Sequence, residues 1–129
     1  MSNQIYKHGD FCWTELMTPD TKKAKEFYNS LFGWTFQDHD MGGMTYSMFK
    51  SGDKDLGGMM QTPKEKKDCP PHWMSYISVA NVDETLKKAK SLGAKITMEA
   101  TPVSDYGRFG IIEDPTGAHI AVWQSLKAC

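Results

Sequence analysis

The sequence has no excess of charge of one sign. Its 15 lysine and arginine residues face 16 acidic residues, which gives a net charge of −1. This balance provides no general attraction for a polyanion, so nucleic-acid binding has little support. No apolar run approaches the roughly 20 residues that a membrane-spanning helix needs, and the first ten residues lack the apolar core of a signal peptide. We therefore expect a cytoplasmic protein that binds neither nucleic acid nor a membrane.

Cysteine is scarce and scattered. The three cysteines are Cys12, Cys69 and Cys129, and no two of them have CxxC spacing. An odd and widely spaced set excludes a disulfide framework and a thiolate zinc site as simple explanations. No neighbouring residue marks any of them as a nucleophile. We expect Cys12 to be packed within a strand.

The chain does contain a strand that runs into an amphipathic helix. Apolar residues alternate over Phe11 to Met17, as in a half-buried strand, and Asp20 can cap the helix that follows. That helix places one apolar face against a sheet and ends at Gly33. The residues of this face, at helical spacing, are Ala24, Phe27, Tyr28 and Leu31.

A second copy of this pattern begins near residue 72, at an offset of 61 residues that places Leu31 on Leu92. Here Asn81 and Glu84 resemble a capping box, and Gly93 ends the helix. Three short strands are expected after each helix, at 35–37, 44–50 and 56–61 and then at 95–99, 108–113 and 118–124. The chain thus predicts an α+β fold of two tandem βαβββ modules. A sheet without internal symmetry is the alternative.

The expected domain boundaries follow from this repeat. Residues 1–8 form a flexible lead-in, and 9–125 form one domain with module 1 at 9–61, a polar linker at 62–71 and module 2 at 72–125. Turn-forming residues predict a turn at 38–43 and a loop at 101–107. Gly57 and Gly58 would let the backbone bend or approach another group closely.

Strand alternation separates two faces of the expected sheets. The helix-side face is aliphatic, with Leu16, Ile77, Val79, Ile120 and Val122. The opposite face mixes aromatic, thioether and polar side chains, which is typical of a small-molecule site. Its candidate ligand-binding residues are Trp13, Met48, Met60, Met74, Tyr76, Arg108, His119 and Trp123, and Glu15 is a candidate catalytic residue. A dimer interface or the filling of a barrel would also explain them.

Several motifs carry a resemblance to a known family. They are the pair Phe27 and Tyr28, LFGW at the end of the first helix, and EDPTGAHIAVW at the last strand. With these motifs residues 9–125 resemble the vicinal oxygen chelate superfamily, which includes glyoxalase I, bleomycin-resistance proteins, fosfomycin-resistance enzymes and extradiol dioxygenases. WTEL, YNSLFGW, PHWMSY, GRFG and DPTGA resemble its branch labelled predicted enzymes related to lactoylglutathione lyase. The resemblance implies curved mixed sheets around a shared cavity, and a homodimer.

In metal-dependent members, the resemblance implies a divalent metal held by His or carboxylate side chains from the first and last strands of each module. Here those positions fall on Trp13, Met74, Ala121 and a residue near Met60. None of these offers a ligand for a hard divalent ion. We therefore expect neither a metal nor a cofactor. A different ligand set, made of Glu15, His72 and His119, stays an open alternative.

Glu15 is the most distinctive polar residue of the candidate face. Among Trp13, Tyr76 and Trp123 its carboxylate would be desolvated, which raises its pKa and suits a general base or a hydrogen-bond acceptor. A salt bridge to Arg108 is at least as good an explanation.

Two functions follow as hypotheses. The first is a metal-free binding protein of the bleomycin-resistance kind, for a small aromatic or apolar molecule. The second is a lyase or isomerase in which Glu15 transfers a proton while Arg108 or His119 steadies an oxyanion. Glyoxalase I activity itself is disfavoured, because that chemistry depends on the metal.

Overall fold

The computed structural model describes residues 6–40, 45–63, 68–103 and 105–126 of the chain. Residues 1–5 of the expected lead-in, 64–67 of the linker and Cys129 lie outside the described residues. The elements follow in the order β1 (Phe11–Thr18), α1 (Thr21–Phe32), β2 (Thr35–Asp40), β3 (Thr45–Ser51), β4 (Lys54–Gln61), β5 (His72–Ser78), α2 (Val82–Ser91), β6 (Lys95–Val103), β7 (Gly107–Glu113) and β8 (His119–Ser125).

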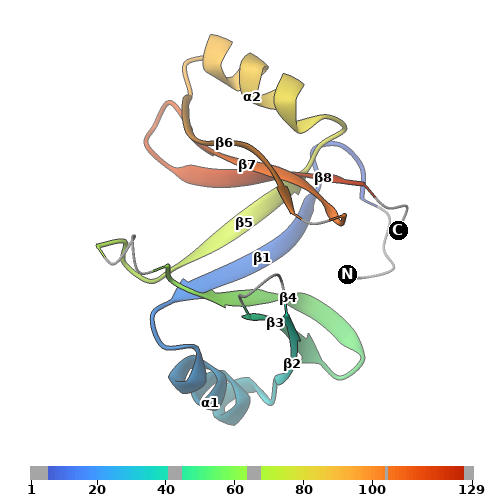
Figure 1. The fold of residues 1–129 in the computed structure, drawn as a ribbon, viewed down its shortest axis with the longest axis vertical. Coiled ribbons are helices and arrows are strands. Elements are labelled where there is room, and N and C mark those ends of the chain that lie inside the picture. The colour runs from blue at the N-terminus through green and yellow to red at the C-terminus, as the bar shows by residue number, and fades with distance from the viewer. Residues whose placement is uncertain (1–5, 41–44, 64–67, 104, 127–129) are drawn as a thin grey trace. The chain divides into compact units, whose positions relative to one another are not determined.

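The chain divides into two compact units. Unit 1 contains Trp13–Met74, and unit 2 contains Ser75–Cys129 together with the described part of Asn3–Cys12. In unit 1 the strand order is β2-β3-β4-β1, with β1 parallel to β4 and the other neighbours antiparallel. In unit 2 the order is β5-β8-β7-β6, with β5 parallel to β8. Both units therefore have a mixed sheet and the order βαβββ, which confirms the predicted α+β class and its duplication (Figure 1).

Both helices begin and end as their sequences predict. The side chain of Asp20 accepts a hydrogen bond from the backbone N–H of Lys23, and Asn81 does the same for Glu84, each over 3.0 Å. These caps satisfy backbone donors that have no partner within the first turn. Gly33 ends α1 in the left-handed conformation with φ of 78°, where a side chain would be strained.

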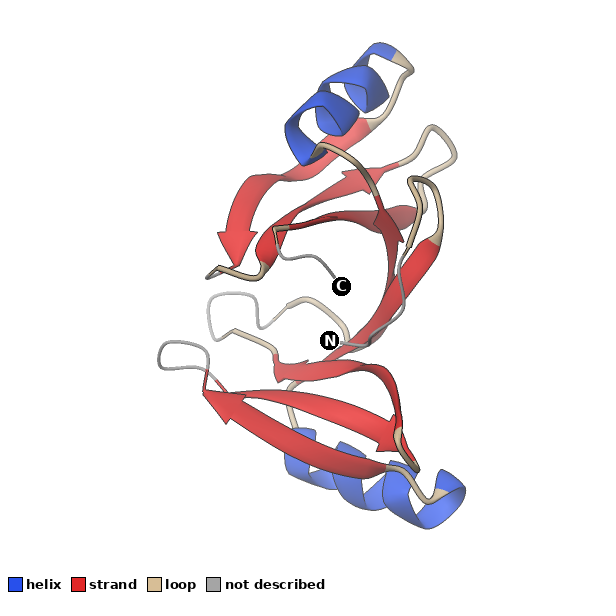
Figure 2. Cartoon of the chain, turned by 90° about the vertical axis from the view of Figure 1, so that its right-hand side faces the viewer, coloured by secondary structure: helices blue, strands red, loops and turns tan. Residues whose placement is uncertain are grey.

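Each helix lies on one face of the strands of its own unit (Figure 2). In unit 2, α2 buries Val82 and Leu86 against Val79 and Val122, and these four residues form one core cluster. The helix-facing side of the unit 1 sheet is buried at Leu16, Phe49 and Met59. A buried helix side is thus present in both units, and in unit 1 an aromatic ring and a thioether join the predicted Leu16.

Helix α1 does not bury its apolar face. No residue of α1 is buried, and Phe27 and Leu31 are each 57% exposed. Trp34 stacks on Phe49 with ring centroids 4.9 Å apart, and Trp73 meets Phe49 edge-on at 5.8 Å. Of the predicted apolar face, Tyr28 packs on these two rings, at 5.3 Å from Trp34 and 5.6 Å from Trp73, so the two tryptophans lie between it and Phe49. The prediction that Phe27 and Leu31 pack on the sheet is therefore wrong.

Two strands extend into segments that were expected to be irregular. Asp38, His39 and Asp40 belong to β2 and pair with β3, so the predicted turn is wrong there, and residues 41–44 lie outside the described part of the chain. Strand β6 likewise includes 101–103, where Pro102 pairs with Arg108. Pro is accepted because β6 is the last strand in the order of its unit. Strand pairing overrides the local preference for a turn in both segments.

In the part of the chain that the structure describes, neither helix is long and apolar enough to cross a membrane.

Candidate functional site

The candidate site lies on the face of the unit 1 sheet that points away from α1. Alternation along β1 places Trp13, Glu15 and Met17 on this face. Strand register brings Gly58 opposite Glu15, and Met60 opposite Met17. On β3, Met48 lies opposite Gly58 and Tyr46 opposite Met60. The predicted ligand-binding residues Trp13, Met48 and Met60 therefore share one face with Glu15.

A chain of two hydrogen bonds joins three side chains on this face. The indole Nε1 of Trp13 donates to the hydroxyl of Tyr46 over 2.8 Å, and that hydroxyl donates to Oε2 of Glu15, also over 2.8 Å. All three side chains are partly buried. The direction of both bonds is fixed, because an indole N–H can only donate and an ionised carboxylate can only accept.

Gly58 makes this arrangement possible. Tyr46 stands on β3 and Glu15 on β1, with β4 between them. A Cβ atom built on Gly58 would lie 2.0 Å from the hydroxyl oxygen of Tyr46 and 2.2 Å from the ring carbon that bears it. The Tyr46 ring therefore crosses β4 directly above Gly58, in space that any side chain at this position would fill.

The chemistry of this face is an acceptor surrounded by soft apolar groups. The Glu15 carboxylate brings negative charge and accepts hydrogen bonds, while Trp13, Met17, Met48 and Met60 offer an indole and three thioethers. Thioethers and aromatic rings contact one another favourably and adapt to varied shapes. The face suits a planar molecule that donates a hydrogen bond or carries positive charge.

The corresponding face of unit 2 has no carboxylate at the position of Glu15. Tyr76 lies opposite Ala121 as Glu15 lies opposite Gly58, and Phe109 takes the place of Tyr46. Tyr76 is 7% exposed, and its ring centroid is 6.3 Å from that of Phe109. Trp123 shares this face, with its ring directly above Gly107. The two units thus differ at the position where a charge could act.

The remaining predicted residues lie in different surroundings. Met74 is half-buried near the start of β5, and His119 begins β8 with its Nε2 3.5 Å from the Glu113 carboxylate. Arg108 does not fit the expectation that it lines the ligand face or pairs with Glu15. It shares the helix side of β7 with Gly110, since Phe109 and Ile111 alternate onto the other face. There its guanidinium donates two hydrogen bonds to the carboxylate of Asp83 on α2, over 2.8 and 3.0 Å.

The contact between Arg108 and Asp83 also shifts the pKa of both groups. The guanidinium hydrogen bonds lower the pKa of Asp83 and raise the pKa of Arg108. Both side chains are exposed enough for solvent to screen the pair. Arg108 therefore works as a surface link between β7 and α2.

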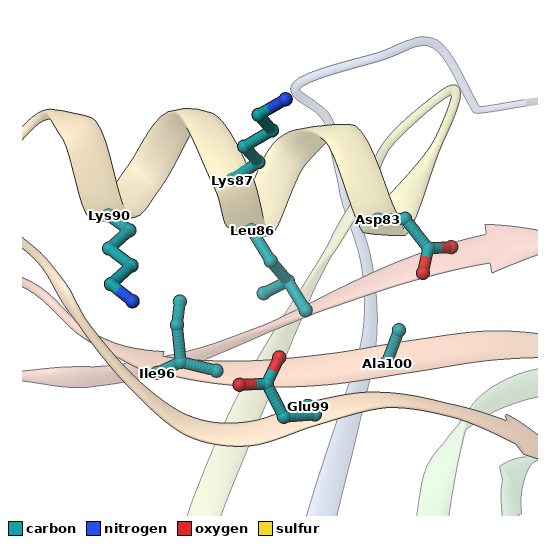
Figure 3. Close-up of a pocket in the computed structure, with 7 residues that line it drawn as sticks. All are labelled: Asp83, Leu86, Lys87, Lys90, Ile96, Glu99 and Ala100. Atoms are coloured by element: carbon teal, nitrogen blue, oxygen red, sulfur yellow. The ribbon is translucent and has the colours of Figure 1, made fainter.

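A surface pocket of about 180 Å³ lies beside this contact, between α2 and β6 (Figure 3). Leu86, Ile96 and Ala100 form its apolar part. Its charged residues are Asp83, Lys87, Lys90 and Glu99. Lys87 extends away from Ile96 and Glu99, so the charged groups do not converge on one point (Figure 3).

The positions that hold a divalent metal in the resembling family do not fit one here. Trp13 and Ala121 lack a suitable lone pair, and Met74 prefers soft metals. Register places Gly58, rather than Met60, at the position that corresponds to Ala121. In the described ranges no three His, Cys, Asp or Glu side chains gather at one point. His72, of the alternative ligand set, has Nδ1 2.9 Å from the backbone oxygen of Pro70 and 3.8 Å from Sγ of Cys69.

His39 stands between two aspartates on β2, but the strand separates its ring from both carboxylates. Asp38 and Asp40 alternate with His39 along β2, so both carboxylates lie on the face opposite the imidazole. Asp38 instead accepts hydrogen bonds from the Ser47 hydroxyl over 2.6 Å and from the Lys25 ammonium over 2.9 Å, and these two contacts lower its pKa.

Tyr46 is not among the residues that the sequence pattern predicts for the site, and the pattern assigns Gly58 no specific partner. The Gly57 and Gly58 pair did signal a close approach, but the sequence did not identify the approaching group. Gly57 serves a different contact, since a Cβ there would lie 2.0 Å from the backbone oxygen of Thr14. A search for an aromatic residue two strand positions from the register partner of Gly58 would have found Tyr46.

Comparison with known proteins gives a consistent result. Residues 11–122 match the family model described as the Glyoxalase/Bleomycin resistance protein/Dioxygenase superfamily. The chain is 37% identical over 125 residues to the Mycobacterium tuberculosis protein named "Putative glyoxylase CFP32", and the match covers 95% of this chain and 48% of that protein. It is 29% identical over 127 residues to the Streptomyces peucetius "Anthracycline biosynthesis protein DnrV", with 87% of this chain and 46% of that protein covered. The chain therefore spans about half the length of these relatives.

Solved structures share the fold. A methylmalonyl-CoA epimerase from Streptomyces coelicolor superimposes with a TM-score of 0.68 at 14% identity, covering 94% of this chain and all of that one. At this identity the likeness concerns the fold alone.

Proposed function

Because the chain belongs to the Glyoxalase/Bleomycin resistance protein/Dioxygenase superfamily, we propose that it binds a small planar molecule on the unit 1 face that carries Glu15. The observation that carries this proposal is the hydrogen-bonded chain from Trp13 through Tyr46 to Glu15. It holds one carboxylate in a fixed place on a surface that is otherwise indole and thioether. Ligand sites commonly combine such apolar walls with a few fixed polar groups.

Binding would take place without a metal. The ring of the ligand would lie against Trp13, Met48 and Met60, where aromatic and thioether contacts supply affinity. Glu15 would accept a hydrogen bond from an N–H or O–H group of the ligand. The name of the DnrV relative, which refers to anthracycline biosynthesis, agrees with an aromatic ligand.

A second candidate function is proton transfer by Glu15. The same hydrogen bond from Tyr46 would hold the carboxylate in position to take a proton from carbon or oxygen, as a lyase or isomerase requires. The relative named as a glyoxylase, at 37% identity, agrees with an enzymatic role. Arg108 is not proposed as the oxyanion partner, because Asp83 holds its guanidinium.

Other features expected from the sequence stay predictions. These are the participation of Met74, Tyr76, His119 and Trp123 in ligand binding, the homodimer and the cytoplasmic location.

The charge preference of the ligand tests the binding proposal. Three probes with the same flat ring, naphthol, naphthylmethylamine and naphthoate, would be titrated against protein with ¹³C-labelled methionine methyl groups. We expect the methyl resonances of Met17, Met48 and Met60 to shift, and the two donors to bind at least about tenfold more tightly than naphthoate, a difference of roughly 1.4 kcal/mol. A fixed carboxylate repels the anion and accepts from the donors.

Glu15→Gln should remove most of this discrimination, because a neutral amide can both donate and accept. Glu26→Gln, on the exposed side of α1, is the matched control and should leave the three affinities unchanged. Unshifted methyl resonances with every probe, or an unchanged preference in Glu15→Gln, would contradict the proposal. Loss of turnover in Glu15→Gln with intact binding would favour the enzyme.

A further inference from the structure

We propose that Tyr46 is the positioning residue for Glu15, and that Gly58 is the position that lets Tyr46 reach it. This inference rests on the proposed role of Glu15, and it assigns the site two residues whose contribution lies in geometry. The contacts that carry it lie inside unit 1.

The first step is that the Tyr46 hydroxyl points in one direction only. Trp13 donates its N–H to the hydroxyl oxygen over 2.8 Å. Since an indole N–H cannot accept, the Tyr46 proton is not used in that contact and is directed to Oε2 of Glu15, over 2.8 Å. Trp13 thus orients Tyr46, and Tyr46 orients Glu15.

The second step is that the Tyr46 hydroxyl can reach Glu15 only because Gly58 has no side chain. The Tyr46 ring has to cross β4 to bring its hydroxyl from β3 to β1. A Cβ at Gly58 would lie 2.0 to 2.3 Å from three atoms of that side chain, far inside contact distance. Alanine at this position would displace the end of the ring, and the hydroxyl would leave Glu15.

The third step is that the fold does not require this arrangement. Strands β5, β8 and β7 repeat the order of β1, β4 and β3 without it, because the positions of Trp13, Glu15, Tyr46 and Gly58 are occupied by Met74, Tyr76, Phe109 and Ala121. Met74, Phe109 and Ala121 have no N–H or O–H group in their side chains, so this set does not repeat the chain from Trp13 through Tyr46 to Glu15. The two hydrogen bonds in unit 1 are therefore not needed to form the sheet, and their effect is to position the Glu15 carboxylate.

The test compares Tyr46→Phe, which keeps the ring and removes the hydroxyl, with Gly58→Ala. NMR would follow the indole N–H of Trp13 and the titration of the Glu15 carboxyl carbon, with no ligand present. In Tyr46→Phe we expect the indole N–H to move upfield and exchange faster. The Glu15 titration midpoint should rise by about one pH unit, because a hydrogen bond to the charged form is lost. Affinity for naphthylmethylamine should fall about tenfold, since the carboxylate is no longer held in place.

Gly58→Ala should reproduce these changes, and adding it to Tyr46→Phe should change the Glu15 titration little further, because the hydroxyl is already absent. If Gly58→Ala does not fold, Tyr46→Phe decides alone. Tyr28→Phe removes a phenol hydroxyl elsewhere in unit 1 and is the control, with no expected change.

Two outcomes separate the inference from the proposed function. An unchanged Glu15 titration and an unchanged Trp13 indole signal in Tyr46→Phe would overturn the positioning role. Altered signals with unchanged naphthylmethylamine binding would support the positioning role and contradict the proposed function instead.

Discussion

At the scale of single residues, the units differ most where their first strands meet the open face. Glu15 of unit 1 corresponds to Tyr76 of unit 2, and the carboxylate has become a buried phenol ring. At this pair of equivalent positions only unit 1 carries a carboxylate. The offset of 61 residues already places Glu15 on Tyr76, and the register shows that they face Gly58 and Ala121 respectively.

Asp38 provides a residue-scale prediction on pH. Its pKa is lowered, first by the hydrogen bond from Ser47 and then by Lys25. A carboxyl with a lower pKa when folded stabilises the protein above its unfolded pKa of about 3.9, and this contribution is lost as pH falls through the folded value. We expect Asp38→Asn to cost no more than about 1 kcal/mol at pH 7, because the side chain is 54% exposed.

Urea unfolding of the wild type and Asp38→Asn between pH 7 and pH 2 measures this contribution. The two stability curves should converge below about pH 4. Asp53→Asn, in the turn between β3 and β4, serves as the control and should run parallel to the wild type. A difference for Asp38→Asn that stays constant across the range would show that the loss has another origin.

The residue scale also marks the limit of sequence analysis at the site. The face that carries Trp13, Glu15, Met48 and Met60 follows from strand alternation, which needs only the spacing of residues. The role of Tyr46 depends on which strands are neighbours and on the register between them. Sequence spacing does not contain that information, and so the bond between two residues 31 positions apart was missed.

At the scale of elements, the two helices have similar caps and very different burial. Leu86 of α2 is 4% exposed and Leu31 of α1 is 57% exposed. The repeat predicts that the apolar face of each helix packs on a sheet. Periodicity indicates which residues share a face of a helix, but it does not indicate that Trp34 and Trp73 already cover Phe49 beneath α1.

This contrast predicts different costs for one substitution. Leu86→Ala removes buried methyl groups and leaves a cavity, and should destabilise the protein by about 2–5 kcal/mol. Leu31→Ala, with much of its side chain in water, should cost less than about 1 kcal/mol. Chemical denaturation of both variants at equal protein concentration measures the difference. Equal costs would indicate that the apolar face of α1 is covered in solution.

The ends of two strands also could not be predicted from local sequence preference. The segment 38–40 has turn-forming residues but belongs to β2, and 101–103 extends β6 although it contains Pro102. Hydrogen bonds to a neighbouring strand compensate for weak local preference. The number and order of elements could therefore be predicted, whereas two of their boundaries could not.

At the scale of the whole molecule, the duplication indicates two units with one topology and unequal interiors. Unit 2 has a continuous cluster of Val79, Val82, Leu86 and Val122 that includes its helix. Unit 1 buries the helix side of its sheet, yet none of the residues of α1 is buried. A shared topology therefore does not imply a shared local stability.

Hydrogen exchange should reveal this inequality. Helix α1 lacks buried side chains to oppose its opening, whereas opening α2 exposes Val82 and Leu86. We expect amides in the middle of α1 to exchange at least about tenfold faster than those in the middle of α2. Mass spectrometry of deuterated protein, with peptides that separate Thr21–Phe32 from Val82–Ser91, measures both helices in one experiment. If the amides of α1 and α2 are equally protected and the protection of α1 weakens on dilution, a second copy covers α1, as the expected homodimer allows. Equal protection of the two helices at every protein concentration would contradict the prediction.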